Sequence, residues 1–390
     1  MKTKRAVLVA LLLMGASFLT QAQIIPLQPI KTAVPFVSYS PDAKGSALGN
    51  CGVATSPDAF SMYYNPAKYA FMQNEHTMIA SGFNLFSSNS TVPFLIYSAF
   101  AQKIGKSAIA ATARYYSMGG EIDFVDEYNQ SLGSYRPSEF AIDVAYAYRF
   151  GEYLSAGVAG RFIHSNLIIG MGNKATSYSI AGDVSVYYKR PLCNLVDMSL
   201  GTSITNIGTK MSYNPSSVRK SFIPTTLRLG TAFKFNFHPK NTLTVNLEFS
   251  KLLVPTPPIR DESGILVYGR DDNVSVFRGM IQSFYDAPGY ALNLETYQLD
   301  HVGTFYQELC EITTGVGLEY NLADHFYARC GFYHAPNMYR GINCFTQGLG
   351  MHFGIFGMDV SYSLYFSSNA YVYDSSLNRS FLRWDMYFAF

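Results

Sequence analysis

Apolar residues alternate with small or polar ones through most of this chain, in segments of roughly 9 to 11 residues, the length of a tilted membrane-crossing strand. Between Asn241 and Ser250, for example, one face of the segment carries Leu243, Val245, Leu247 and Phe249. Similar segments cover 141–149, 227–237 and 356–366. Successive side chains of a strand point to opposite faces. The pattern therefore predicts strands with one face toward lipid and the other toward a lumen, as in an outer-membrane β-barrel.

The composition favours the same fold class over a soluble or helical protein. Charged residues make up 14% of the chain and aromatic residues 15%, whereas ordinary soluble domains are about 25% charged. After residue 22, no apolar run approaches the roughly 18 residues that a transmembrane helix needs. The formal net charge of +2 gives no indication of a nucleic-acid partner. We expect outer-membrane lipid to be the surrounding medium.

Counting the alternating segments gives a barrel of about fourteen strands, an even number as in single-chain bacterial barrels. The strands are expected to begin near Thr77, Pro93, Lys106, Ser138, Tyr153, Thr176, Asp197, Thr225, Asn241, Cys310, His325, Cys344, Phe356 and Phe381. Short turns near Gly105, Gly151, Pro239, Ala323 and Gly354 alternate with long connections at 121–137, 165–175, 207–224, 254–309, 335–343 and 367–380. Such barrels have short periplasmic turns and long extracellular loops. The predicted fold is thus all-β, a fourteen-stranded antiparallel transmembrane barrel whose last strand ends on Phe390.

The first residues predict export. Three basic residues near the start precede an apolar stretch at 6–19, and small or polar residues follow at 20–22, which is typical of a secretory signal peptide. We therefore expect a signal peptide at 1–22, cleavage near Gln23, and a location in the outer membrane of a Gram-negative bacterium. The barrel is then expected to span residues 76–390.

Residues 23–75 lack the alternation and are rich in Pro, Gly, Ser and Ala. A barrel this wide is often filled by loops or helices, so we predict that this segment is an N-terminal plug; a periplasmic tail is the alternative. Its turn chemistry predicts helix starts at Asp42, Asp58 and Asn65. The plug motif that carries this turn chemistry comprises Ser56, Pro57, Asp58, Asn65, Pro66 and Ala67.

Charges of both signs occupy predicted lumen-facing positions. They are Arg114, Asp143, Arg161, Asp183, Lys189, Arg228, Lys234, Glu248, Glu319, Arg329, Asp359, Arg383 and Asp385. A selective channel would favour one sign at a constriction. We therefore interpret the mixture as ion pairs that hold the plug inside the barrel.

The sequence gives little support for catalysis or for a cofactor. The spacing of the five cysteines matches no metal site; Cys330 and Cys344 are the pair most suited to a disulfide, although free thiols are favoured. The histidines are scattered, and none lies beside a Gly-x-Ser-x-Gly sequence. His334 and His352 on neighbouring predicted strands leave a lipid A deacylase as a weak alternative. We expect a protein that is not an enzyme and that has no cofactor and no metal.

Seven segments together resemble the PorV family. They are Ser40–Asp42, Gly52–Ala59, Asn65–Phe71, Phe140–Asp143, Asn206–Gly208, Phe222–Gly230 and Lys251–Pro258. The resemblance covers essentially the whole chain after residue 22. It departs at Gly45–Asn50, where the family carries a glycine-rich run, and at Tyr64, where tryptophan is common. A paralogue with altered cargo or partner choice is consistent with these departures.

The resemblance implies a carrier in type IX secretion. PorV-like proteins bind the C-terminal signal domains of secreted cargo at the outer-membrane translocon, SprA/Sov, and deliver them to the cell-surface PorU sortase complex. The broader FadL-like barrels are likewise fourteen-stranded and carry Asn-Pro-Ala near their plug. They imply the alternative function, transport of hydrophobic small molecules.

The longest connection, residues 254–309, contains many apolar residues, which is unusual for a loop exposed to water. Loops of this length are usually functional or disordered. We predict a surface here that binds cargo or a partner protein, with a folded lid over the barrel mouth as the alternative. The predicted binding residues are Leu252, Leu253, Val254, Pro255, Tyr268, Phe277, Met280 and Phe284.

Overall fold

The computed structural model describes residues 24–25, 29–72, 77–86, 92–120, 122–125, 131–169, 173–213, 219–238, 240–293, 298–336, 341–367 and 381–390. The predicted signal peptide and the predicted turn at Pro239 lie outside these residues. Within them, no helix is long and apolar enough to cross a membrane.

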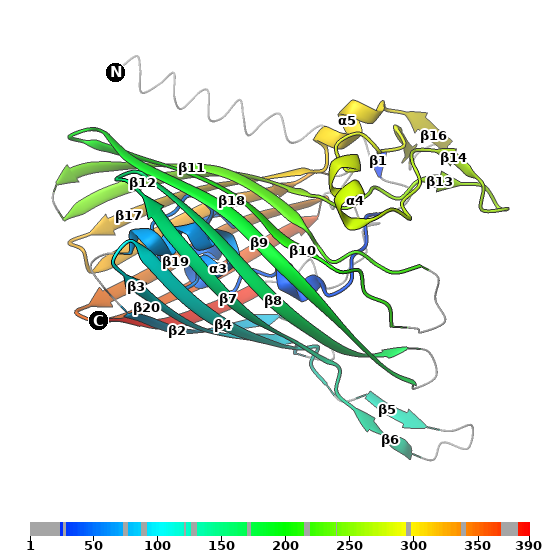
Figure 1. Ribbon diagram of the computed structural model, residues 1–390, viewed down its shortest axis with the longest axis horizontal. Helices are drawn as coiled ribbons and strands as arrows, with labels where there is room; N and C mark the ends of the chain where they lie inside the picture. The colour runs from blue at the N-terminus through cyan, green and yellow to red at the C-terminus, as the bar shows by residue number, and fades with distance from the viewer. Residues whose placement is uncertain are drawn as a thin grey trace.

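Fourteen antiparallel strands form a closed barrel in which β2 pairs with β21 (Figure 1). They are β2 (Thr77–Phe86), β3 (Phe94–Ile104), β4 (Ser107–Ser117), β7 (Ser138–Phe150), β8 (Leu154–Ile169), β9 (Asn173–Cys193), β10 (Val196–Gly208), β11 (Thr226–His238), β12 (Asn241–Leu252), β17 (Ile312–Leu322), β18 (Phe326–Ala335), β19 (Ile342–Phe353), β20 (Phe356–Ser367) and β21 (Phe381–Ala389). Backbone bonds between Thr77 and Phe390 at 2.7 and 3.1 Å complete the closure. The predicted fourteen-stranded barrel is confirmed.

Alternation along each strand separates an apolar outer face from a polar or small inner face. In β7, Asp143 and Ala145 are buried, whereas Ile142, Val144 and Tyr146 are 50%, 62% and 48% exposed. A water-soluble protein places these residue types the other way round. The outer surface is therefore suited to hydrocarbon, and the polar groups of the wall point inward.

The connections at the two ends of the barrel differ in length. At one end, here the short-turn end, tight turns such as the one at Gly151 join the strands, and the left-handed φ of +68° at this position favours glycine. At the opposite end, the cap end, the chain forms the hairpin of β5 (Ile122–Val125) and β6 (Ser131–Tyr135) and a folded cap (Figure 1). The predicted alternation of short and long connections is thus present.

The cap is built from the connection between β12 and β17. It contains β13 (Ile259–Arg260), β14 (Leu266–Tyr268), α4 (Val276–Gln282), β15 (Tyr290–Asn293), β16 (Gln298–His301) and α5 (Thr304–Leu309). The N-terminal strand β1 (Ile24–Ile25) pairs with β15. The loop that was predicted to be long is therefore a small folded unit.

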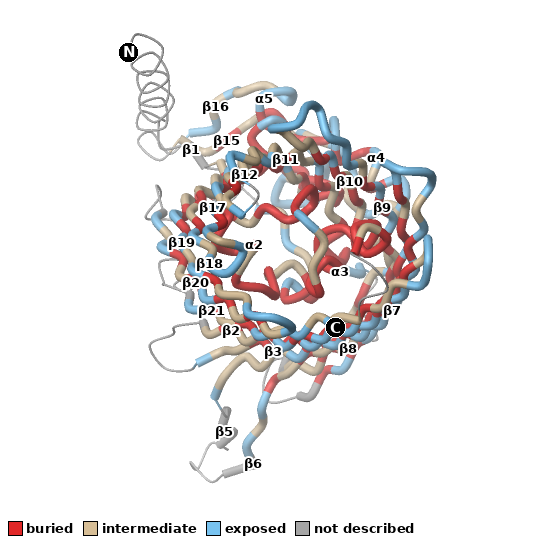
Figure 2. The backbone as a smooth tube through the Cα atoms, turned by 90° about the vertical axis from the view of Figure 1, so that its left-hand side faces the viewer, coloured by how far each residue is buried: buried red, intermediate tan, exposed pale blue. Residues whose placement is uncertain are grey.

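The plug lies inside the ring of strands (Figure 2). It consists of η1 (Pro35–Ser38), α2 (Ala43–Ala47), α3 (Ser61–Tyr64) and η2 (Pro66–Phe71). Two predicted helix starts are confirmed, because the Asp42 carboxylate accepts from the amide of Gly45 and the Asn65 side chain from that of Ala67. The start predicted at Asp58 is wrong. The Asp58 side chain instead accepts from the hydroxyl of Ser61, and α3 begins three residues later.

All five cysteines are free thiols. The register places Cys330 opposite Gln347 and Cys344 opposite Tyr333, so the two sulfurs considered for a disulfide are not cross-strand partners. The structure therefore agrees with the favoured prediction of free thiols.

Candidate binding site

Glycines in the barrel wall let the plug backbone lie directly against the strands. A Cβ atom at Gly201 would come within 2.0 Å of the carbonyl oxygen of Val53, and one at Gly157 within 2.6 Å of the amide nitrogen of Ala67. Such separations are far shorter than van der Waals contact. The lumen is thus shaped for this particular segment, which reaches the wall from the interior side.

Asn65 connects the plug to the wall through its side-chain amide. Its nitrogen donates to the carbonyl oxygens of Val53, at 2.9 Å, and Val186, at 3.0 Å, while its oxygen caps η2. The hydroxyl of Ser155 donates to the carbonyl of Ala67 at 2.7 Å. The Asn-Pro-Ala part of the predicted plug motif therefore joins two plug turns to strands β8 and β9.

Asp58, in the other part of the plug motif, lies in a charged cluster inside the plug. Its carboxylate is 3.3 Å from the ammonium of Lys44 and 4.0 Å from that of Lys68. Lys44 also donates to the hydroxyl of Ser56 at 3.0 Å. These contacts join α2 to the turn before α3, so the motif stabilises the plug itself.

Most of the predicted lumen charges lie in ion-pair chains. Asp143 lies between Arg114, at 3.0 Å, and Arg161, and Arg161 also pairs with Asp183 at 3.0 Å. Further pairs form on the other side of the barrel, namely Arg228–Glu248, Arg329–Glu319 and Arg329–Asp359. Because a buried charge without a partner is strongly unfavourable, this pairing is what allows so many charges inside the wall.

Two carboxylates of the wall bind backbone amides of the plug. Glu248 accepts from the amides of Gly52 and Val53 at 2.7 and 2.8 Å, and Asp385 accepts from the amide of Ala43 at 2.7 Å. Hydrogen bonds to charged groups are stronger than neutral ones. The plug is therefore held by hydrogen bonds to carboxyl groups on two separate wall strands, β12 and β21.

The cap rests on an apolar base at the end of β12. Leu252 and Val254 pack with Phe222, and the amide of Leu253 donates to the carbonyl of Thr225 at 2.7 Å. Leu252, Leu253 and Val254 are only 7%, 3% and 3% exposed, and Pro255 is also buried. These four predicted binding residues therefore support the cap from below and are not part of its accessible surface.

A polar cluster lies above this base and joins the barrel wall to α5. The ammonium of Lys251 is 2.9 Å from the Glu308 carboxylate and 2.7 Å from that of Glu311. Glu311 also accepts from the hydroxyl of Thr256 at 2.7 Å. The second oxygen of Glu308 accepts from the amide of Ala287 at 2.9 Å. The cluster thus holds three separate stretches of the cap together.

Asp286 adds a third carboxylate to this region. Burial, together with the nearby negative charge of Glu308, raises its pKa to about 7. Burial also raises the pKa of Glu311. One Asp286 oxygen accepts from the side chain of Gln282 and from the amide of Thr256, both at 3.2 Å. The core of the cap is therefore held by hydrogen bonds and contains a carboxyl group whose pKa is raised to about 7.

Apolar side chains cover the outer surface of the two cap helices. On α4 and the turn after it, Phe277, Ile281 and Phe284 are 71%, 65% and 51% exposed. Their spacing of three to four residues places them on one helix face. On α5, Phe305 and Tyr306 are 77% and 49% exposed. Exposed aromatic residues on a rigid support are characteristic of protein-binding surfaces.

The structure thus separates the predicted binding residues into two groups. Tyr268, Phe277 and Phe284 are exposed, and Met280 is half-buried on α4. The α5 residues were not singled out from the sequence, although their grouping as Phe305, Tyr306 and Leu309 was a usable signal.

The two histidines considered for a lipid A deacylase do not lie close together. His334 is opposite Asn343 near the cap end, whereas His352 lies near the other end of the same strand pair.

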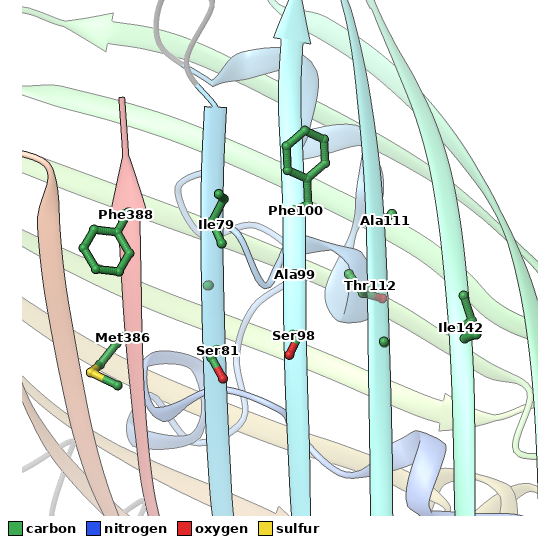
Figure 3. Close-up of a pocket in the computed structure, with 12 residues that line it drawn as sticks. Ile79, Ser81, Ser98, Ala99, Phe100, Ala111, Thr112, Ile142, Met386 and Phe388 are labelled. Atoms are coloured by element: carbon green, nitrogen blue, oxygen red, sulfur yellow. The ribbon is translucent and has the colours of Figure 1, made fainter.

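A shallow hollow of about 500 Å³ lies on the outer face of the barrel wall. Figure 3 shows Ser81, Ser98 and Ala111 on adjacent strands, with larger side chains such as Phe100 and Met386 around them. The small residues create the hollow, and the surrounding apolar side chains make it suited to hydrocarbon.

Together, the closed barrel, its apolar outer face and its plugged lumen define an outer-membrane β-barrel of the plug-containing class. No group of three His, Cys, Asp or Glu side chains that could hold a metal ion occurs among the described residues.

The sequence comparison identifies the family. The family model described as "Type IX secretion system protein PorV" matches residues 23–259, more than half of the chain. The chain therefore belongs to the PorV family, and the resemblance seen in the sequence is confirmed. No curated protein sequence matches the chain.

Several solved structures are similar to this chain in fold. The Pseudomonas putida toluene transporter TodX is 11% identical, with coverage of 95% of this chain and 99% of that one and a TM-score of 0.50. The Ralstonia pickettii toluene transporter TbuX is 13% identical, with coverage of 90% and 97% and a TM-score of 0.47. The CymD monoaromatic hydrocarbon channel is 12% identical, with coverage of 88% and 95% and a TM-score of 0.49. At such identities the similarity concerns the fold alone.

Proposed function

We propose that this PorV-family protein is an outer-membrane carrier of type IX secretion, which binds the C-terminal signal domain of a secreted cargo protein on its cap. The observation that carries the proposal is the exposed apolar surface of α4 and α5, held by a buried polar cluster. A surface that is rigid before binding loses little entropy on association. The role is non-catalytic.

The proposal includes an orientation and a set of partners. Short turns are periplasmic in barrels of this kind, so the cap would face the cell exterior. Cargo would then reach the cap at the SprA/Sov translocon and leave it for the PorU sortase complex. The part that precedes the barrel is proposed to be a cleaved signal peptide, residues 1–22, followed by the plug, residues 23–75.

The second candidate function is transport of hydrophobic small molecules. It is favoured by the apolar hollow in the barrel wall and by the shared fold with the toluene transporter TodX. The lumen argues against it, because the plug is bound by Glu248 and Asp385 and contacts wall glycines directly. A transported molecule would have to displace those contacts.

The test uses the purified protein in detergent and a labelled C-terminal domain of a secreted cargo protein. Replacing Phe277 and Phe284 by serine removes two exposed anchors whose full burial is worth about 1.5–3 kcal/mol each. Binding of the domain should therefore weaken by at least about ten-fold. Leu299→Ser on β16 removes an apolar side chain that is 40% exposed elsewhere on the cap, and serves as the matched control.

Two results would contradict the carrier function. One is absence of cargo-domain binding by the unchanged protein, combined with uptake of a labelled hydrophobic solute into proteoliposomes. The other is an equal loss of binding in the serine variant and in the Leu299→Ser control, which would show that the α4 surface is not the contact.

A further inference from the structure

The short-turn end of the lumen carries cations that are not members of the ion-pair chains described above. Lys189 and Lys234 occupy inward-facing positions, since each follows a buried inward residue by two places, Tyr187 and Ala232 respectively. Within the described part of the chain, neither ammonium has a carboxylate within ion-pair distance. Both are exposed at this mouth of the barrel.

Two further cations line the same mouth. The guanidinium of Arg149 stacks over the ring of Phe71 with its carbon 4.5 Å from the ring centroid, and Lys103 donates to the carbonyl of Met72 at 2.7 Å. Phe71 also packs against Tyr187, with ring centroids 5.4 Å apart. The end of η2 therefore forms an aromatic floor, with cations around it.

The charges facing this space are mainly positive. Lys189 lies within electrostatic reach of Lys234, Arg149 and Asp197, and the strand register places Asp197 directly opposite Lys234. The Asp197 carboxylate accepts from the side-chain amide of Asn236 at 3.1 Å, so part of its hydrogen-bonding capacity is already used. The guanidinium of Arg149 also donates to the backbone carbonyl of Glu152 at 2.7 Å, and its buried inner nitrogen (Nε) has no hydrogen-bond partner in the described residues. The excess of positive charge favours an anionic ligand here.

We propose that the short-turn mouth is a binding site for an acidic polypeptide segment of another protein. Arg149, Lys189 and Lys234 extend from β7 to β11 along five adjacent strands. At about 4.8 Å between neighbouring strands, this arc is about 19 Å long. A single phosphate or lipid headgroup would engage only part of it, whereas an extended acidic segment could contact cations along its whole length.

The orientation given above makes this partner periplasmic, and the site lies at the opposite end of the barrel from the cap. Both sites therefore can be occupied at the same time. The anion is held by solvated cations around an aromatic floor, so its affinity should fall steeply with salt.

The test measures binding of a fluorescein-labelled twelve-residue Asp/Glu/Ser peptide to the full-length protein in neutral detergent, by fluorescence anisotropy. Binding should be saturable, absent for a Gln/Ser peptide of equal length, and weakened about five-fold by the double variant Lys189→Gln, Lys234→Gln. Lys220→Gln at the cap end removes an exposed lysine far from this mouth and should leave binding unchanged.

Several results would overturn the proposal. They are equal binding of the Gln/Ser peptide, an equal loss in the Lys220→Gln control, or displacement by millimolar inorganic phosphate as effective as displacement by the unlabelled acidic peptide. Tight capture of phosphatidylglycerol nanodiscs that depends on Lys189 and Lys234, without peptide binding, would instead assign the site to lipid headgroups. The Phe277→Ser, Phe284→Ser variant should bind the acidic peptide normally, so failure of the cap proposal is distinguishable from failure here.

Discussion

Replacing Lys251 by methionine should loosen the cap while the barrel stays folded. The substitution keeps the length of the side chain but removes the ammonium that lies between Glu308 and Glu311. Breaking a buried ion pair by removing one partner typically costs about 3–5 kcal/mol. Two carboxylates lose their partner here, but the raised pKa of Glu311 lets that group take up a proton. We therefore expect about 3–5 kcal/mol rather than twice that amount.

The loss should be confined to the cap because the barrel strands are held by an independent ladder of backbone hydrogen bonds. Hydrogen–deuterium exchange with mass spectrometry separates the two regions. Peptides from 276–309 should exchange about 100-fold faster or more, since each 1.4 kcal/mol of local stability is a factor of ten. Peptides from β7 and β8 should be unchanged.

Lys220→Met provides the control, because Lys220 is exposed at the same end of the barrel. If exchange in the cap stays at the level of the unchanged protein, the cluster does not hold the cap and the reasoning is refuted. The same conclusion follows if Lys220→Met accelerates cap exchange as much as Lys251→Met does. Faster exchange throughout the barrel would show that Lys251 stabilises the whole fold.

Three further predictions concern pH, the wall and the plug. Because the folded pKa of Asp286, about 7, lies above its usual value of 3.8, its contribution to cap stability is complete below about pH 4 and is lost as the pH rises through 7. Cap exchange should therefore quicken over that range, and Asp286→Asn should reduce the dependence to the part that Glu311 contributes. Gly201→Val would collide with Val53 and should reduce the heat-resistant folded band in electrophoresis, whereas Gly160→Val, with open space around its Cβ position, should not. Asn65→Ala removes a helix cap and two donors and should lower the free energy of unfolding by about 1–3 kcal/mol, measured as a lower midpoint of urea unfolding; an unchanged midpoint would contradict the role assigned to Asn65.

The strands could be predicted from the sequence because their signal is local. Alternation such as that of Ile142 and Val144 with Asp143 depends only on a membrane outside and a lumen inside, so it can be read without knowing the neighbouring strands. The helix start at Asp42 was equally local. The start at Asp58 was not, because Lys44 and Ser61 take up its carboxylate, and those contacts depend on how the plug folds.

The binding surface was predictable only in part, because it depends on contacts between residues far apart in the sequence. The apolar residues of the long loop are visible in the sequence, but their exposure depends on what folds against them. Leu253 is buried because Thr225, 28 positions earlier in the chain, binds its amide, whereas Phe277 is left exposed on the outer face of α4. Alternation cannot distinguish these two outcomes in a region that has no regular strands.

The placement of the lumen charges follows from the cost of burying a charge. The sequence identifies which charged residues face inward, but their pairing depends on strand neighbours: Asp143 meets Arg161 because β7 and β8 place these residues directly opposite each other. A charge deep in the wall needs such a partner, or a hydrogen bond like the one that Asp385 accepts from the amide of Ala43, since its desolvation is otherwise too costly. A charge that has neither is least costly near a mouth, where water solvates it. Lys189 and Lys234 satisfy that condition, so a surplus of inward-facing cations predicts a charged mouth and, with it, a place where an anionic partner can bind.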